Sequence, residues 1–140
     1  MFTAIDVSTS GLVAQRARIN TIAGNLANLS TTHNEQGEAK PYQPRFVTFQ
    51  ADPNIGGEQG AAGVRVDSVQ ISNIEPVWKY QPGHPDALKK GEHAGYVAYP
   101  GIDMTMEMVD AIEASRAYEA NLGVIQVSKS LTAQSLKIVA

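Results

Sequence analysis

The chain has 140 residues, of which 43% are hydrophobic and 18% are charged, and its formal net charge is -3. This composition is typical of one globular domain and excludes a disordered chain. The 11 Lys and Arg residues are scattered, with only Lys89 and Lys90 adjacent, so no basic face indicates a nucleic-acid partner. The chain has no Cys, which excludes disulfides and thiolate metal sites.

Membrane and secretion signals are weak. No stretch approaches the ~20 consecutive apolar residues that span a bilayer. Residues 1–11 contain Asp6 and neither Lys nor Arg, so they lack the basic region and the apolar core of a secretory signal. We therefore expect any export to use a route other than general secretion.

The first predicted element is a helix over residues 3–29, a stretch without proline. Apolar residues recur in it at seven-residue steps, and neighbours widen this stripe as an amphipathic helix requires. The stripe consists of Ile5, Leu12, Ile19 and Leu26, widened by Ile22, Ala23, Ala27 and Leu29. Gly11 and Gly24 each cost roughly 1 kcal/mol inside a helix, so we expect this helix to be weak in isolation.

The middle of the chain predicts short strands and turns. Strand-like alternation occurs in residues 45–49 and 63–71, and further short strands are expected at 76–80 and 95–99. All seven prolines lie between Pro41 and Pro100, which agrees with turns between these strands.

The last predicted element is a helix from about residue 103 to residue 140. Asp103 is placed to cap its start, and Glu107 lies just inside, where a negative charge favours the helix dipole. One seam with alternating steps of 3 and 4 residues is typical of a coiled coil. It contains Met108, Ala111, Ser115, Tyr118, Leu122, Ile125, Lys129, Thr132, Leu136 and Val139, and a second stripe contains Ile112, Ala120, Val124, Val127, Leu131 and Ile138.

These signals predict a mainly α protein with a small β insertion (α+β), in which two long terminal helices form a coiled coil. The expected zones are residues 1–32, 33–102 and 103–140, which together make one structural domain. The middle zone is too small to cover both helices, so apolar stripes should remain exposed and mark association surfaces. Repeated head to tail, such contacts make an open helical filament. A soluble helical adaptor or a chaperone-like binding module would show the same periodicity, as would an ordinary helix–strand–helix domain.

Metal and catalytic signals are poor. His33, His84 and His93 have no cysteine beside them and no i, i+4 pairing, so we expect no metal site. No spacing links serines, histidines and acids into a nucleophile elbow or a catalytic triad. We therefore expect no enzyme activity, no cofactor and no small-molecule substrate, unless a pocket brings polar groups together.

Several segments carry a family resemblance. Ser10–Leu12, Ala14-Gln15, Asn20, Ile22-Ala23, Asn25–Asn28 and Thr31-Thr32 resemble the N-terminal signature of flagellar rod and hook axial proteins. Tyr80–Ala87, Gly95–Pro100 and Ala114–Asn121 resemble the C-type proximal rod proteins within that family. Gly101-Ile102 departs from the Asn-Val step that is usual there. The matches cover about half of the chain and follow the family's order.

The resemblance implies a structural subunit of the proximal rod of the bacterial flagellar basal body, which crosses the periplasm. It implies export, without cleavage, by the flagellar type III apparatus, and an inner layer of terminal coiled-coil helices that transmits torque. The implied partners are copies of the chain, other proximal rod proteins, the distal rod protein and the rod-base or export-gate proteins.

We expect residues on the helical stripes and in the signature segments to mediate subunit assembly. Asn25 and Asn28 share a helix face and could fix register between helices, and Arg116 and Glu119 are spaced to pair. The complete set is Ile5, Leu12, Ile19, Ile22, Asn25, Leu26, Ala27, Asn28, Met108, Ile112, Ser115, Arg116, Tyr118, Glu119, Asn121, Leu122, Ile125, Leu131 and Leu136. We also expect both helical ends to be largely disordered in a dilute monomer and to fold on assembly.

Overall fold

The computed structural model describes residues 2–34, 36–56 and 60–139, and among these the side chains of residues 2, 138 and 139 are not described. It consists of two long helices and two antiparallel hairpins, in the order α1 (Phe2–Ala27), β1 (Arg45–Asp52), β2 (Gly63–Ile71), β3 (Val77–Tyr80), β4 (Tyr96–Tyr99) and α2 (Met104–Val139). β1 pairs with β2, and β3 pairs with β4. The prediction of a mainly α protein with a small β insertion is confirmed.

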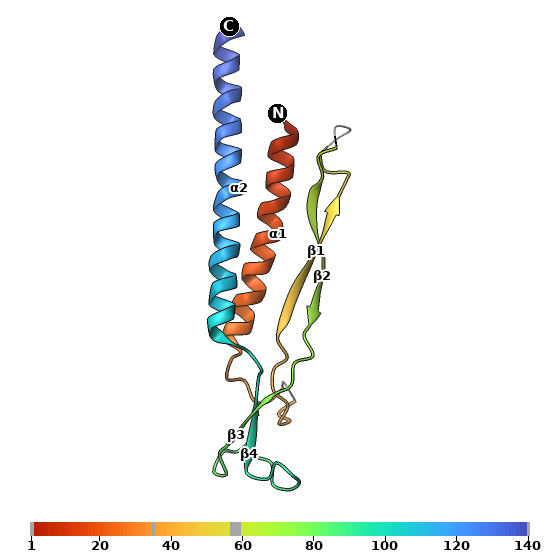
Figure 1. Cartoon of the computed structure of the whole chain (residues 1–140), viewed down its shortest axis with the longest axis vertical. Coiled ribbons are helices and arrows are strands. Elements are labelled where there is room, and N and C mark those ends of the chain that lie inside the picture. Colours follow the sequence, from red (N-terminus) through yellow and green to blue (C-terminus); the bar gives the residue numbers. More distant parts are fainter. Residues whose placement is uncertain (1, 35, 57–59, 140) are drawn as a thin grey trace.

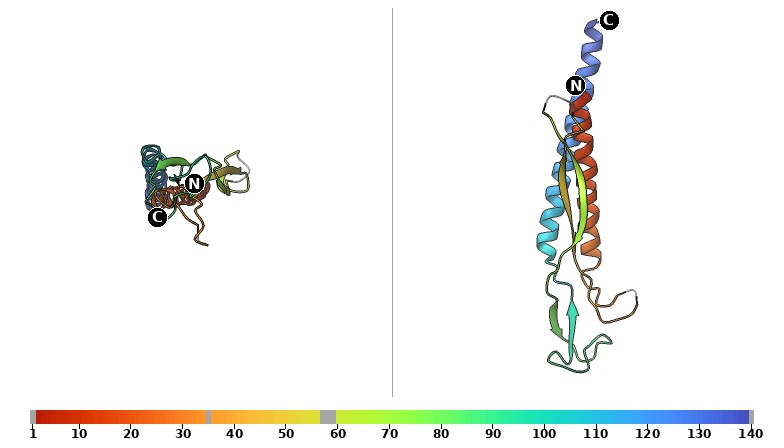
Figure 2. Two further views of the ribbon diagram at one scale, coloured as in Figure 1. Left: turned by 90° about the horizontal axis from the view of Figure 1, so that it is seen from below. Right: turned by 90° about the vertical axis from the view of Figure 1, so that its right-hand side faces the viewer.

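The molecule is elongated, and its layers follow from the order of the elements. α1 lies between α2 and the β1–β2 hairpin, which runs along the opposite side of α1 (Figures 1 and 2). The labelled N and C ends lie toward one end of the molecule, and the β3–β4 hairpin forms the other end (Figure 1). α2 therefore has a single long neighbour within the chain, and its other faces are open.

A side chain forms hydrogen bonds to free backbone groups at the start of α2 and at the end of α1. The predicted cap of α2 is confirmed, because Asp103 Oδ1 accepts hydrogen bonds from the backbone N–H of Thr105 (2.8 Å) and Met106 (3.3 Å). At the end of α1, Asn28 Nδ2 donates to the carbonyl oxygen of Gly24 at 2.8 Å, and Asn28 Oδ1 accepts from the Thr31 hydroxyl at 3.1 Å. Asn28 thus ends the helix.

The seam between α1 and α2 is built from small and polar residues. Ala14 and Ala114 are buried at its centre, and a Cβ on Gly11 would lie 2.9 Å from the side-chain nitrogen of Asn121. The helices approach closely because these positions lack bulk. Their antiparallel register places Gly11 opposite Asn121 and Asn25 opposite Glu107.

The predicted seam of α2 is only half correct. Its members Ala111, Tyr118, Ile125 and Thr132 are buried or half-buried, whereas Met108, Ser115, Leu122, Lys129 and Leu136 are exposed. Ala114, Asn121 and Ser128 occupy the inward positions in their place. The close helix approach favours small side chains such as Ala114 at the centre of the seam, although Ile125 is also buried. The side chains of Val139 and of Ile138, predicted on the second stripe, lie outside the described residues.

The β1–β2 hairpin is held on α1 near the α1 N-terminus by Ser10. The backbone N–H of Val64 donates to Ser10 Oγ at 3.0 Å, and the Ser10 hydroxyl donates to the carbonyl oxygen of Val7 at 2.6 Å. Gly63 permits this approach, because a Cβ there would lie 2.5 Å from Ile55 Cγ2 and 2.9 Å from Ser10 Oγ. The strand is therefore seated directly on the helix.

Candidate assembly surfaces

One buried side chain joins three elements. Asn25 on α1 is 2% exposed, and its Nδ2 donates to the carbonyl oxygen of Arg45 (2.8 Å) and to Glu107 Oε1 (3.1 Å). Its Oδ1 accepts from the backbone N–H of Arg45 (2.9 Å) and from the Tyr42 hydroxyl (3.3 Å). Both donors and both acceptor sites of the amide are in use, so Asn25 fixes the start of β1 and the start of α2 against α1.

The carboxyl of Glu107 lies at this junction. Partial burial raises its pKa above the ordinary value, the hydrogen bond from Asn25 opposes this change, and the charge of Asp110 adds to it. The charged form of Glu107 is therefore disfavoured in the folded chain.

Arg18 makes a second cross-helix contact one heptad before Asn25. Its Nη2 lies 3.3 Å from Asp110 Oδ1 and 3.1 Å from Glu113 Oε2. All three side chains are partly exposed, so each pair is worth well under about 1 kcal/mol. The contact contributes more to register than to stability.

A third polar junction ties the loop after α1 to the β3–β4 end. The hydroxyl of Thr32, which is buried, donates to Asp86 Oδ2 at 2.5 Å. The Nδ1 atoms of His33 and His84 lie 3.5 Å and 3.9 Å from the same oxygen. The Thr32 hydrogen bond is the main reason why the pKa of Asp86 lies below its ordinary value, and positive charge on the histidines acts in the same direction.

In the described part of the chain, no group of three His, Asp or Glu side chains is placed to hold a metal ion.

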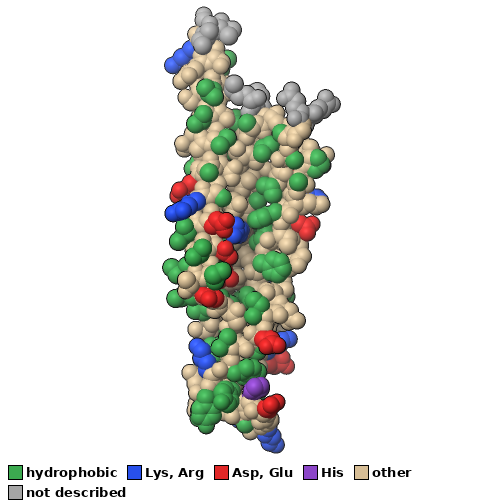
Figure 3. Space-filling model, viewed as in Figure 1, with side chains coloured by type: hydrophobic (Ala, Val, Ile, Leu, Met, Phe, Trp, Pro, Cys, Tyr) green, Lys and Arg blue, Asp and Glu red, His purple; other side chains and the backbone are tan. Residues whose placement is uncertain are grey.

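The outer face of α2 carries a row of apolar side chains that the chain leaves uncovered. Their exposed fractions range from 41% to 65%. They are Met104, Met106, Met108, Val109, Ile112, Leu122, Val124, Val127, Leu131 and Leu136. Figure 3 shows hydrophobic side chains gathered along the α2 side of the molecule and over the β1–β2 hairpin. Apolar surface on this scale marks an association site.

The residues predicted for assembly fall into three groups. Exposed side chains are those of Ala27, Met108, Ile112, Ser115, Arg116, Glu119, Leu122, Leu131 and Leu136. Half-buried ones are Ile5, Leu12, Ile19, Leu26, Asn28, Tyr118 and Asn121. Ile22, Asn25 and Ile125 are buried within the chain.

The structure shows what two of the predicted side-chain pairings do within a single chain. The amide of Asn25 bonds Glu107 across the two helices, and it also bonds Arg45 on a strand that the helix pattern did not place beside it. Arg116 and Glu119 form no ion pair among the described residues; both point into solvent, where such a pair gains little.

Three residues that join elements of the chain, Arg18, Ser10 and Thr32, were not predicted from the sequence. Arg18 was not among the residues predicted for assembly, and the bonds of Ser10 and Thr32 were not predicted. The signal for Arg18 was present, since Gly11, Arg18 and Asn25 recur every seven residues beside the apolar stripe. Nothing local to the sequence points Ser10 toward Val64.

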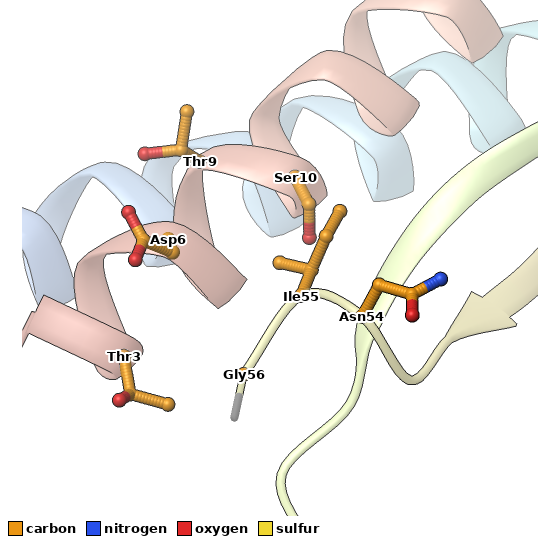
Figure 4. Close-up of a pocket in the computed structure, with 7 residues that line it drawn as sticks. All are labelled: Thr3, Asp6, Thr9, Ser10, Asn54, Ile55 and Gly56. Atoms are coloured by element: carbon orange, nitrogen blue, oxygen red, sulfur yellow. The ribbon is translucent and has the colours of Figure 1, made fainter. Parts of the chain in front are cut away.

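The hollow near the α1 N-terminus does not have the groups of a catalytic site. It has a volume of about 580 Å³ and lies between α1 and the turn after β1 (Figure 4). Thr3, Asp6, Thr9 and Ser10 line it from α1, Asn54, Ile55 and Gly56 line it from the turn, and Ser10 lies closest to Ile55 in the view (Figure 4). Among these lining residues there is one carboxylate and no histidine, lysine or arginine, so no acid–base pair is formed there.

Neither described helix has an apolar stretch that could cross a membrane.

The two terminal regions match known protein families. Residues 5–33 match the family described as "Flagella basal body rod protein", and residues 93–138 match "Flagellar basal body rod FlgEFG protein C-terminal". Each match lies mainly on a long helix, and together they define the class as a flagellar basal-body rod protein.

Relatives of similar length define the family more closely. The flagellar basal-body rod protein FlgC of Borreliella burgdorferi is 39% identical over 99% of this chain and 97% of its own length. The proteins of the same name from Salmonella typhimurium and Bacillus subtilis are 38% and 33% identical, over 95% and 98% of this chain and 93% and 97% of their own lengths. The chain belongs to the FlgC family of flagellar basal-body rod proteins. This confirms the resemblance, the role as a structural rod subunit and the location in the basal body, and it does not favour the adaptor alternative.

Proposed function

We propose that this rod protein forms part of the proximal segment of the rod and assembles through the exposed faces of α1 and α2. Its partners would be copies of itself, other proximal rod proteins, the distal rod protein and the rod-base or export-gate proteins, and it would reach them through the flagellar type III apparatus. Its work is mechanical, and it carries out no catalysis. Membership of the FlgC family supports the part of this proposal that places the chain in the flagellar rod.

The observation that carries the proposal is the uncovered apolar row of α2. Among the described helices and strands, α2 packs along α1 alone, and small residues form much of the seam. Ten large apolar side chains therefore remain open to a neighbour, from Met104 near the start of the helix to Leu136 near its end. Burying such a row contributes roughly 25 cal/mol for each Å² of apolar surface. Repetition over many subunits would join long helices side by side into a shaft that resists twisting.

The test compares charge introduced on this row with the same charge introduced away from α2. Ile112→Lys and Val124→Lys place an ammonium group on the apolar face, whereas Gln36→Lys places one at an exposed polar position in the loop after α1. In cells that lack their own copy, we expect the first two variants to abolish motility and to be absent from isolated basal bodies. Gln36→Lys should support both. Normal motility with Ile112→Lys and Val124→Lys would contradict the proposal.

Amide hydrogen exchange separates rod assembly from a stably folded adaptor. A rod subunit is expected to exchange fast over residues 1–30 and 104–140 when dilute and slowly when assembled. Strong protection of both regions in the dilute chain, unchanged on addition of rod proteins, would favour an adaptor.

A further inference from the structure

A groove lies at the start of α2, where the segment before β3 passes the helix. It has a volume of about 480 Å³, and Ile74, Val77 and Met104 line it with side chains that are about half exposed. Gly101 brings its walls together, because a Cβ there would lie 2.6 Å from the carbonyl oxygen of Glu75 and 2.6 Å from Ile74 Cγ2. The groove is therefore an open hollow whose walls include these apolar side chains.

The other end of α2 extends past its neighbour α1. The register set by Gly11 opposite Asn121 brings the start of α1 opposite about residue 130 of α2. Beyond that point α2 projects past α1 (Figure 1), and every residue from 133 to 137 is exposed. Leu131 and Leu136 are 50% and 65% exposed there.

The charges of the two ends are complementary. After Glu119 the chain carries Lys129 and Lys137 and no further acidic residue. The groove is flanked by Glu75 and Asp103, both exposed. An apolar, basic helix end therefore matches an apolar, acidic groove.

We propose that the projecting C-terminal turns of α2 dock in this groove on a second copy of the chain. Met104 at the groove and Leu136 in the projecting turns lie on one continuous helix, about 48 Å apart at 1.5 Å per residue, so a tail cannot reach its own groove. Each copy offers one tail and one groove, and such a contact is head to tail and leaves an open end for the next copy. This inference rests on the proposed assembly through α1 and α2, and it adds the pairing of ends.

Cysteine cross-linking tests the contact, because the natural chain has no cysteine. Two full-length variants, Ile74→Cys and Leu136→Cys, are assembled together and oxidised with copper–phenanthroline. We expect a disulfide-linked dimer that contains one copy of each variant. Val13→Cys mixed with Leu136→Cys serves as the control, because Val13 is also exposed but lies on α1, and it should yield at least about tenfold less dimer.

Charge exchange gives an independent readout. Glu75→Lys and Lys137→Glu should each weaken association of the full chain by about 3–10-fold, and the double variant should recover most of the loss. Higher salt should reduce the difference. Equal weakening in the double variant would contradict the pairing.

The outcomes distinguish this inference from the broader proposal. If the wild-type chain assembles in sedimentation experiments and Ile74→Cys with Leu136→Cys gives no more dimer than the control, the pairing of ends is wrong while assembly stands. If Leu136→Cys cross-links only to a different rod protein, the occupant of the groove is not a second copy. If the chain associates neither with itself nor with rod proteins, both proposals fail.

Discussion

Asn25 and Arg45 pair as two residues of a β-ladder would, although one of them lies on a helix. The side-chain amide of Asn25 donates to the Arg45 carbonyl oxygen at 2.8 Å and accepts from the Arg45 backbone N–H at 2.9 Å. The same amide donates to Glu107 at the start of α2. Since Asn25 is buried, this residue organises the chain itself, and any effect on assembly would follow from that.

Replacing Asn25 with Ala should destabilise the folded chain by about 2 kcal/mol or more. The change leaves the backbone N–H and C=O of Arg45 without their side-chain partner, and an unsatisfied buried group costs about 1–3 kcal/mol. Chemical denaturation measures the loss, and amide exchange at Arg45 should become faster. Asn20→Ala, at an exposed position of α1, is the control. Equal stability of the two variants would contradict the role of Asn25.

Replacing Gly63 with Ala should cost about 1–3 kcal/mol through overpacking. The new methyl group would lie 2.5 Å from Ile55 Cγ2 and 2.9 Å from Ser10 Oγ, so β2 would have to move away from α1. The free energy of unfolding checks this, together with the exchange rate of the Val64 amide. Gly83→Ala is the matched control, because a Cβ there meets nothing within 4 Å. A change no larger than in the control would mean that β2 does not need this close approach.

Replacing Glu107 with Gln should stabilise the folded chain relative to wild type more at neutral pH than at acid pH. Burial raises the pKa of Glu107 in the folded chain. Below the unfolded pKa of about 4.3 the carboxyl is protonated in both states, and its ionisation does not affect the free energy of unfolding. As the pH rises through the raised folded pKa, ionisation of the half-buried carboxyl lowers the free energy of unfolding. Gln keeps an oxygen that accepts from Asn25 and removes this dependence. Unfolding experiments from pH 3 to pH 7 measure it, with Glu119→Gln on the same helix as the control for loss of one charge. Parallel pH profiles for wild type and Glu107→Gln would count against the prediction.

Replacing Thr32 with Val should raise the pKa of Asp86 toward its ordinary value, because the Thr32 hydroxyl is the main cause of the lowering. A lowered folded pKa gives stability that is present above the unfolded value of about 3.9 and is lost as the pH falls through the folded value. The variant should therefore lose stability at neutral pH and approach wild type in strong acid. NMR titration of the Asp86 carboxyl measures the pKa directly. Thr31→Val is the control, since the Thr31 hydroxyl bonds Asn28 instead; an identical titration in Thr32→Val and wild type would refute the assignment.

Most of the fold could be predicted because its signals are local. The N-terminal helix was predicted over residues 3–29 and spans Phe2–Ala27, and the strand predicted over 63–71 has those limits in the structure. Proline exclusion and alternation depend on neighbouring residues only. The cap at Asp103 was predictable for the same reason.

The face of α2 that meets α1 could not be predicted in this way. Periodicity favours large apolar residues such as Met108 and Leu122 as the seam, whereas the structure places Ala114 and Asn121 there. Whether a seam is tight or wide depends on the opposite helix, here on Gly11, and no pattern within α2 contains that information. The bonds of Asn25 to β1 and of Ser10 to β2 were missed for a related reason, since their partners lie 20 and 54 residues away.

The two attachments of the hairpin to α1 have a consequence under load. Ser10 holds β2 and Asn25 holds β1, at points 15 residues or about 22 Å apart along the helix. A force that slides the hairpin lengthwise strains both attachments at once, whereas a force that peels it away breaks them one after the other. We therefore expect the hairpin to resist sliding along α1 better than it resists peeling away from α1.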